Sequence, residues 1–191
     1  MELRPSVQFA QSHFNGRNDL ICMEVGVLIG LHAAAMEHYL HPKMLYLVDL
    51  WEPCNWTYKN EDYRNADQNY ETTKNKFKDK ANITIIKGRS HDVMPKMEEN
   101  SFDFIYIDGD HDVTSCRYDI LNAIRLVKIG GIVGGHDYGA VHLDANSMPK
   151  CNGNHAVPGA VYSVFKGMKI QTGGDMDWWV VMNEEVKGRI P

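Results

Sequence analysis

The sequence predicts one α/β domain, residues 1–191, in which helices cover both faces of a parallel sheet. Short apolar runs alternate along the chain with longer amphipathic runs, which is the order expected for strands separated by helices. The short runs are apolar at nearly every position, as expected for parallel strands that are buried on both faces. A length of 191 residues suits one domain with one hydrophobic core.

Three strands and two helices are predicted in the first half of the chain. The strands are short apolar runs at residues 20–26, 44–50 and 82–88. The first helix, residues 30–40, is ended by Pro42, because proline cannot continue a helix. The second helix, residues 63–80, is polar and carries Tyr63, Tyr70 and Phe77 at intervals of seven residues.

The second half of the chain predicts four more strands and two more helices. The strands are residues 102–108, 131–137, 169–173 and 177–183. A helix at residues 115–131 has one apolar face, made by Cys116, Ile120, Ala123, Ile124 and Val127. Lys128 lies near its predicted end, and Gly130 is expected to follow as the residue that terminates it. Residues 157–168 form the last predicted helix.

The composition excludes several classes of protein. A net charge of -5 leaves no basic surface for nucleic acid, and no apolar run is long enough to span a membrane. Residues 1–14 lack the apolar segment of a secretory signal. The four cysteines lie far apart and form no C-x-x-C pair, which argues against a disulfide framework or a zinc knuckle; they are Cys22, Cys54, Cys116 and Cys151. We therefore expect a cytoplasmic protein that acts on a small molecule; its oligomeric state stays open, a homo-oligomer included.

Polar side chains occur where the predicted strands end. Parallel sheets bind ligands beyond the carboxyl ends of their strands. The residues that end or directly follow a strand, and that should share this rim, are Glu24, Asp49, Ser90, Asp108 and Asp137. A buried strand is costly to end in charge, so the run "FIYIDGDHDV" (104–113) predicts a site at its tip.

The segment "EVGVLIG" (24–30) predicts a nucleoside-binding turn. Gly26 allows a tight turn and the close approach of a ligand. Asp49, 23 residues later, is placed to accept hydrogen bonds from both hydroxyls of an adenosine ribose. That role fits NAD as well as S-adenosylmethionine, but the segment is not the pyrophosphate-binding G-x-G-x-x-G, and S-adenosylmethionine has no pyrophosphate. A plain strand-to-helix turn, with Asp49 as a solvated acid, is the simpler alternative.

Asp108 and Asp137 should end adjacent strands, with His136 beside them. Carboxylate oxygens and an imidazole nitrogen are suitable ligands for a divalent cation, so Asp108, His136 and Asp137 are predicted metal ligands. Asp110 and Asp112 have a simpler explanation, since either could cap the helix that begins near residue 113. That explanation holds for Asp112 but does not account for Asp108.

Five segments together resemble one enzyme family: "MEVGVLIG", "LYLVDLW", "KGRSHD", "FDFIYIDGDHDV" and "LVKIGGIVGGHDY". The chain is similar to class I S-adenosylmethionine-dependent methyltransferases. It most resembles small macrocin-type (TylF/MycE-like) O-methyltransferases, which are related in architecture to catechol O-methyltransferase. The resemblance covers residues 23–138, about 60% of the chain. It implies a Rossmann-like, doubly wound sheet of seven strands, in which "DWWVVMN" runs antiparallel beside the fifth strand.

The resemblance also implies roles for single residues. Glu24 and Gly26 would face the methionine moiety, with Glu24 near its ammonium. Gly30 would also belong to the cofactor site, and Asp49 would hold the ribose. Ser90 and His91 would lie near the adenine. Asp108 and Asp137 would bind the metal, and His111 falls where such enzymes carry the proton-abstracting base. These families usually have a carboxylate where this chain has His136, and imidazole favours transition metals over Mg²⁺. The site would then prefer such a metal, or have lost its metal.

Two long loops, residues 51–63 and 138–157, are predicted to be active-site lids that determine which substrate is bound. Trp51, Trp56 and Tyr58 suit either stacking on a ligand or packing, while His142, Cys151 and His155 match no established zinc spacing. His32, His38 and His41 are expected to have surface or packing roles.

These features predict methyl transfer from S-adenosylmethionine to a hydroxyl of a sugar, a phenol or a diol. A cation on Asp108 and Asp137 would lower the pKa of that hydroxyl, and His111 would take its proton. The alternatives are a metal-independent methyltransferase that uses His111 alone, a non-catalytic module that binds an adenosine ligand, and an NAD-dependent oxidoreductase.

Overall fold

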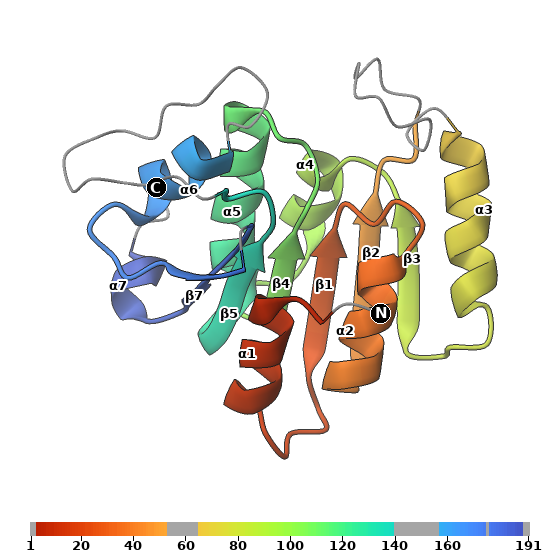
Figure 1. Ribbon diagram of the computed structural model, residues 1–191, viewed down its shortest axis with the longest axis horizontal. Helices are drawn as coiled ribbons and strands as arrows, with labels where there is room; N and C mark the ends of the chain where they lie inside the picture. The colour runs from red at the N-terminus through yellow and green to blue at the C-terminus, as the bar shows by residue number, and fades with distance from the viewer. Residues whose placement is uncertain (1–2, 53–64, 140–156, 175, 189–191) are drawn as a thin grey trace.

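The computed structural model describes residues 3–52, 65–139, 157–174 and 176–188. Seven strands form one sheet in the order β3-β2-β1-β4-β5-β7-β6 (Figure 1). Their bounds are β1 Ile21–Val25, β2 Met44–Asp49, β3 Ile83–Lys87, β4 Phe102–Ile107, β5 Val127–Gly135, β6 Gln171–Gly173 and β7 Asp177–Val181. The first five strands pair in parallel, whereas β7 pairs antiparallel with both β5 and β6. The predicted Rossmann-like sheet, with "DWWVVMN" antiparallel beside the fifth strand, is confirmed.

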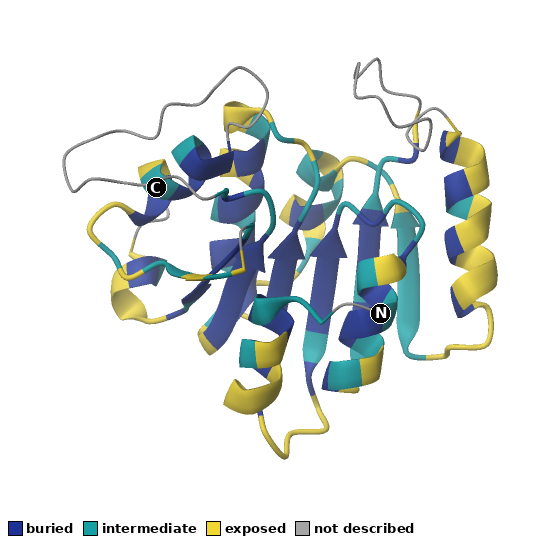
Figure 2. Cartoon of the chain, viewed as in Figure 1, coloured by how far each residue is buried: buried dark blue, intermediate teal, exposed yellow. Residues whose placement is uncertain are grey.

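Helices cover both faces of the sheet (Figure 1). One face packs against α1 Pro5–His13, α2 Leu31–Leu40 and α3 Ala66–Phe77. The other face packs against the 3₁₀ turn η2 Met94–Lys96, α5 Val113–Leu126, α6 Val157–Phe165 and α7 Glu184–Lys187, with the short helix α4 Ser90–Val93 before η2. Figure 2 shows β1 and β4 buried along nearly their whole length, while the edge strand β3 is half-buried. No helix within these described ranges is long and apolar enough to cross a membrane.

Helix α1 was not predicted, and it positions part of the site. Pro5 stands in its first turn, a position that suits proline because no intrahelical donor is lost there. Ser6, Val7 and Ala10 are its buried residues. Two short apolar side chains are too weak a periodic signal to predict a helix from sequence.

The predicted boundary between the third helix and the fifth strand is wrong. The helix ends at Leu126 and β5 begins at once with Val127, which pairs with Phe102; the register between β4 and β5 then shifts before Phe104 pairs with Ile132. Gly130 does have positive φ, +80°, but it lies within β5, where its N–H donates to the carbonyl of Met182 at 2.9 Å. A glycine that permits an irregular strand leaves the same sequence signal as one that ends a helix.

Other element ends differ by a few residues. The helix predicted at 63–80 is α3, Ala66–Phe77, and residues 63–64 lie outside the described residues. The helix predicted at 157–168 ends at Phe165. Cys22 and Cys116 are buried, with exposures of 0% and 1%, as expected for small core residues.

Candidate active site

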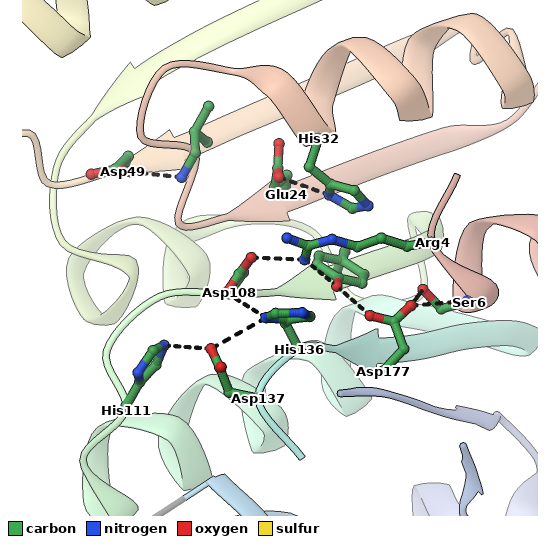
Figure 3. A network of polar contacts seen from close by, with 12 residues as sticks. Arg4, Ser6, Glu24, His32, Asp49, Asp108, His111, His136, Asp137 and Asp177 are labelled. Atoms are coloured by element: carbon green, nitrogen blue, oxygen red, sulfur yellow. Dashed lines mark hydrogen bonds and ion pairs between the residues drawn. The ribbon is translucent and has the colours of Figure 1, made fainter. Parts of the chain in front are cut away.

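The carboxyl ends of β1, β2, β4 and β5 bring four acidic residues to one rim of the sheet (Figure 3). They are Glu24 within β1, Asp49 at the end of β2, Asp108 directly after β4, and Asp137 shortly after β5. β4 and β5 are neighbours, with Ile107 paired to Gly135, so Asp108 and Asp137 follow adjacent strand ends as expected.

The end of β4 occupies the space where a side chain at position 26 would lie, so only glycine fits there without displacing the backbone. Its φ is +85°, and a Cβ there would lie 2.6 Å from the amide nitrogen of Gly109 and closer still to the Asp108 carbonyl. The Asp108 N–H in turn donates to the carbonyl of Val25 at 2.7 Å. Within the described chain, the group that comes close to Gly26 is the β4–α5 loop, and the approach of a ligand there stays a prediction. Gly30, with φ +69°, similarly leaves room for the Phe77 ring, 2.7 Å from its would-be Cβ.

Asp49 organises the turn after β1. Its Oδ2 accepts hydrogen bonds from the backbone N–H groups of Val27 at 2.7 Å and Leu28 at 2.9 Å. Its Oδ1 accepts the N–H of Trp51 at 2.9 Å. A carboxylate has about four acceptor positions, so these bonds leave room for about one hydroxyl donor.

Trp51 is a packing residue. Its ring is 4% exposed, its Nε1 donates to the carbonyl of Leu28 at 2.8 Å, and it lies 5.0 Å from the ring of Tyr70. Trp56, Tyr58, His142, Cys151 and His155 lie outside the described residues.

Glu24 and His32 form a buried pair beside the rim. His32 Nδ1 lies 2.9 Å from Glu24 Oε1, and their side chains are 8% and 2% exposed. Burial raises the pKa of Glu24 well above its ordinary value, and burial lowers the pKa of His32 to about 3. Among the described residues, Glu24 Oε2 and His32 Nε2 have no hydrogen-bond partner. A buried polar atom without a partner is costly, so both atoms suit a polar ligand.

Arg4 reaches the same rim from the N-terminal segment, and sequence reasoning missed it. Its Nη1 donates to Asp108 Oδ2 at 2.8 Å and to the hydroxyl of Tyr106. Burial acts to lower the pKa of Arg4, but its interactions with Tyr106 and Asp108 raise this pKa above its ordinary value. More than 100 residues separate Arg4 from Asp108, so no local signal points to the pair.

Asp108, His111 and Asp137 form the group best suited to hold a metal. Each offers one ligand atom, and these atoms all lie within 4.8 Å of one another. His136, the third predicted ligand, lies next to this group: its Nδ1 is 3.8 Å from Asp108 Oδ1 and 3.4 Å from Asp137 Oδ2. His111 joins the group because the β4–α5 loop brings it to Asp137 (Figure 3).

The contact between His111 and Asp137 shifts the pKa of both side chains. His111 Nε2 lies 2.9 Å from Asp137 Oδ2. The hydrogen bond that His111 donates to Asp137 raises the pKa of His111, against the effect of burial. Burial acts to raise the pKa of Asp137, but hydrogen bonds with His111 and His136 hold it well below its ordinary value.

Ser90 and His91 begin α4 and face α5. His91 Nε2 lies 3.7 Å from Asp119 Oδ1, and its ring centroid lies 4.2 Å from that of Tyr118, with the two rings tilted by 47°. Burial raises the pKa of Asp119 to about 6, while a hydrogen bond from Ser90 opposes this shift. The role predicted for Ser90 and His91 at the adenine stays a prediction.

The two other acids of the β4–α5 loop shape its backbone. Asp112 caps α5, since its Oδ1 accepts the N–H groups of Thr114 at 2.9 Å and Ser115 at 3.2 Å. Asp110 Oδ1 accepts the N–H of Asp112 at 3.0 Å. The simpler explanation given for Asp112 from the sequence is confirmed.

A family model described as a methyltransferase domain matches residues 23–138, more than half of the chain. The chain belongs to this methyltransferase domain family. The matched region contains Glu24, Asp49, Asp108, His111 and Asp137, but not Arg4. Family membership supports S-adenosylmethionine as the methyl donor, and so confirms the broader class predicted above. A comparison with curated proteins found no match.

Solved structures share the fold at low sequence identity. An O-methyltransferase from Bacillus cereus, in complex with SAH, is 15% identical with a TM-score of 0.59, over 95% of this chain and 83% of that one. A Corynebacterium glutamicum protein is 14% identical with a TM-score of 0.66, over 94% and 82% of the two chains. The YcgJ protein from Bacillus subtilis is 16% identical with a TM-score of 0.48, over 69% of this chain and 49% of that one. At these identities, the likeness to the Bacillus cereus and Corynebacterium glutamicum proteins shows the fold alone.

Proposed function

We propose that this methyltransferase transfers the methyl group of S-adenosylmethionine to a hydroxyl of a small molecule, assisted by a divalent cation. The observation that carries the proposal is the group Asp108, His111 and Asp137, whose ligand atoms lie within 4.8 Å of one another at the strand ends. The sequence resemblance to macrocin-type O-methyltransferases supports the same reaction. The acceptor classes that we propose are sugars, phenols and diols.

The rim offers suitable groups for the methyl donor. The unpartnered Oε2 of Glu24 is a buried acceptor that fits an ammonium group. Asp49 retains about one acceptor position for a ribose hydroxyl. S-adenosylmethionine supplies a methyl group activated by a positively charged sulfur.

Two carboxylates and an imidazole also fit a divalent cation. Asp108 and Asp137 would hold it, and a cation there lowers the pKa of a bound hydroxyl. We propose that His111 accepts the hydroxyl proton and that Asp137 orients its imidazole through the 2.9 Å contact. His111 must be neutral to act, and Asp137 raises its pKa. The rate should therefore rise with pH through a midpoint above about 6.5, the ordinary histidine value.

The proximity of the three ligand atoms favours a second role for His111, as a metal ligand. Metal affinity distinguishes the two roles. As a base, His111→Ala keeps the cation and loses about 10²–10⁴ in rate. As a ligand, the same change weakens metal binding together with activity. His136→Asp should shift the metal preference toward Mg²⁺, because a harder ligand suits a harder ion.

The test is methyl transfer to a panel of sugars, phenols and diols, first with chelator and then with single metals restored. Asp108→Ala and Asp137→Ala should behave like chelation and abolish activity, while S-adenosylhomocysteine still binds. Asp49→Ala should instead weaken S-adenosylhomocysteine at least about tenfold, measured by calorimetry. Asp110→Ala is the matched control, because Asp110 is an exposed acid of the same loop outside the metal group. Full activity in chelator would contradict metal assistance and leave His111 as the only base.

A further inference from the structure

The N-terminal segment is anchored across the rim by a buried network. Asp177, at the start of β7, is 3% exposed and accepts three hydrogen bonds. Ser6 donates two of them to Oδ2, from its N–H at 3.0 Å and its hydroxyl at 2.6 Å. Tyr106 donates the third to Oδ1, at 2.8 Å, and the same hydroxyl accepts from Arg4 Nη1. The network holds the chain two residues after Arg4, through Ser6, and holds the Arg4 guanidinium through Tyr106.

The guanidinium of Arg4 lies between the two halves of the candidate site. Figure 3 shows it with Glu24 and His32 on one side and with Asp108 and His136 on the other. Burial is the largest cause of the pKa shifts of Glu24 and His32, and the nearby charge of Arg4 opposes the rise at Glu24 and adds to the fall at His32, which agrees with this position. On the opposite side it makes the 2.8 Å ion pair with Asp108.

Most of the guanidinium remains available to a ligand. Both hydrogen bonds that Arg4 donates to described residues use Nη1, which leaves the donors on Nε and Nη2 for a ligand. A guanidinium has five N–H donors in a planar fork that suits a carboxylate. The Arg4 side chain is 26% exposed, so a ligand lying on the rim can reach it.

The methionine end of the methyl donor carries charges that a guanidinium on the rim could complement. These charges are an ammonium and a carboxylate side by side. Glu24 offers an acceptor to the ammonium, while the carboxylates of Asp108 and Asp137 attract the ammonium and repel the carboxylate of the donor. A cation between them, with unused donors, resolves this conflict.

We propose that Arg4 binds the carboxylate of the methionine moiety and thereby positions the methyl donor. The inference rests on the proposed function, because it needs S-adenosylmethionine as the donor. It adds a residue outside residues 23–138, the part of the chain that matches the family. Ser6, Tyr106 and Asp177 act through Arg4 as positioning residues. Because Arg4 also holds Asp108 Oδ2, it links donor binding to the proposed metal ligand.

Calorimetry with two ligands tests the proposal. One ligand is S-adenosylhomocysteine, and the other is its decarboxylated analogue, which keeps the ammonium. Wild-type protein should prefer S-adenosylhomocysteine by about 10- to 100-fold, the effect of charge-assisted hydrogen bonds. Arg4→Gln should remove most of this preference by weakening S-adenosylhomocysteine alone. Arg4→Lys should keep part of it, because lysine retains the charge but not the fork.

Arg17→Gln is the matched control. Arg17 also lies near the N-terminus and pairs with a β4 acid, Asp103, at 2.8 Å, but Asp103 lies near the start of β4 while Asp108 follows its end. This variant should keep the full preference for S-adenosylhomocysteine. Equal weakening of both ligands by Arg4→Gln would overturn the inference and show that Arg4 acts only through Asp108 or α1.

Wild-type protein alone provides a second test that does not depend on the folding of a variant. If it binds both ligands equally well, Arg4 does not bind the carboxylate. If wild-type protein binds neither ligand, the proposed function itself fails, and the inference fails with it.

Discussion

Replacing Gly26 with alanine tests how closely the end of β4 approaches the turn after β1. A Cβ at Gly26 would lie 2.6 Å from the amide nitrogen of Gly109, where ordinary contact begins at 3.4 Å. The conflicting atoms are backbone and cannot rotate away as a flexible side chain would. The Asp108 N–H, bonded to Val25 at 2.7 Å, holds this backbone in place.

The matched control is Gly16→Ala. Gly16 has nearly the same φ, +81° against +85° for Gly26, but nothing lies within 4 Å of its would-be Cβ. Both variants carry the left-handed backbone strain of about 1–2 kcal/mol, offset in part by a less flexible unfolded chain. Only Gly26→Ala adds the overpacking cost of about 1–3 kcal/mol. Its free energy of unfolding should fall by about 2–4 kcal/mol, and that of Gly16→Ala by about 1 kcal/mol or less.

Urea unfolding followed by tryptophan fluorescence measures both variants, since Trp51, Trp178 and Trp179 are buried. In a thermal melt, Gly26→Ala should lose about 5–15 °C. Gly26→Ala should also weaken metal and cofactor binding, because the displaced backbone belongs to Asp108. Equal losses of stability in the two variants would refute the argument, since backbone strain alone would then explain both.

Two further predictions concern buried acids. Asp177→Ala should lower the free energy of unfolding by about 2–4 kcal/mol, because it leaves the Ser6 and Tyr106 donors without an acceptor. Urea unfolding measures this loss, and unchanged stability would show that water replaces the carboxylate. Burial raises the pKa of Asp119 to about 6, above its unfolded value of 3.8, so its ionisation costs stability as the pH rises through this range. Asp119→Asn should therefore gain stability relative to wild type by up to about 3 kcal/mol between pH 4 and pH 8. A difference that does not change with pH would contradict the assigned pKa.

Local pattern was enough to predict most strands and the acidic rim. A strand buried on both faces, such as β4, has a nearly continuous apolar run, and the charge that follows it is visible in the sequence. Parallel strands place their carboxyl ends on one edge, so Glu24, Asp49, Asp108 and Asp137 could be assigned to one rim before their contacts were known. Asp112 was identified as a cap because capping involves residues only two or three positions away.

Contacts between distant segments were decided by the tertiary structure alone. Val127 belongs to β5 and not to the helix, because it pairs with Phe102 in the sheet. This pairing outweighs the helical periodicity of the segment that contains Val127. His111 meets Asp137, and Glu24 meets His32, only because loops and helices fold back over the strand ends. The composition of a segment records the preferences of its own backbone and its degree of burial, but it holds no information about which side chain will approach from elsewhere. The sequence by itself therefore determined the sheet and the acidic residues on its rim. Tertiary packing decided which basic side chains contact those acids, namely Arg4, His32 and His111.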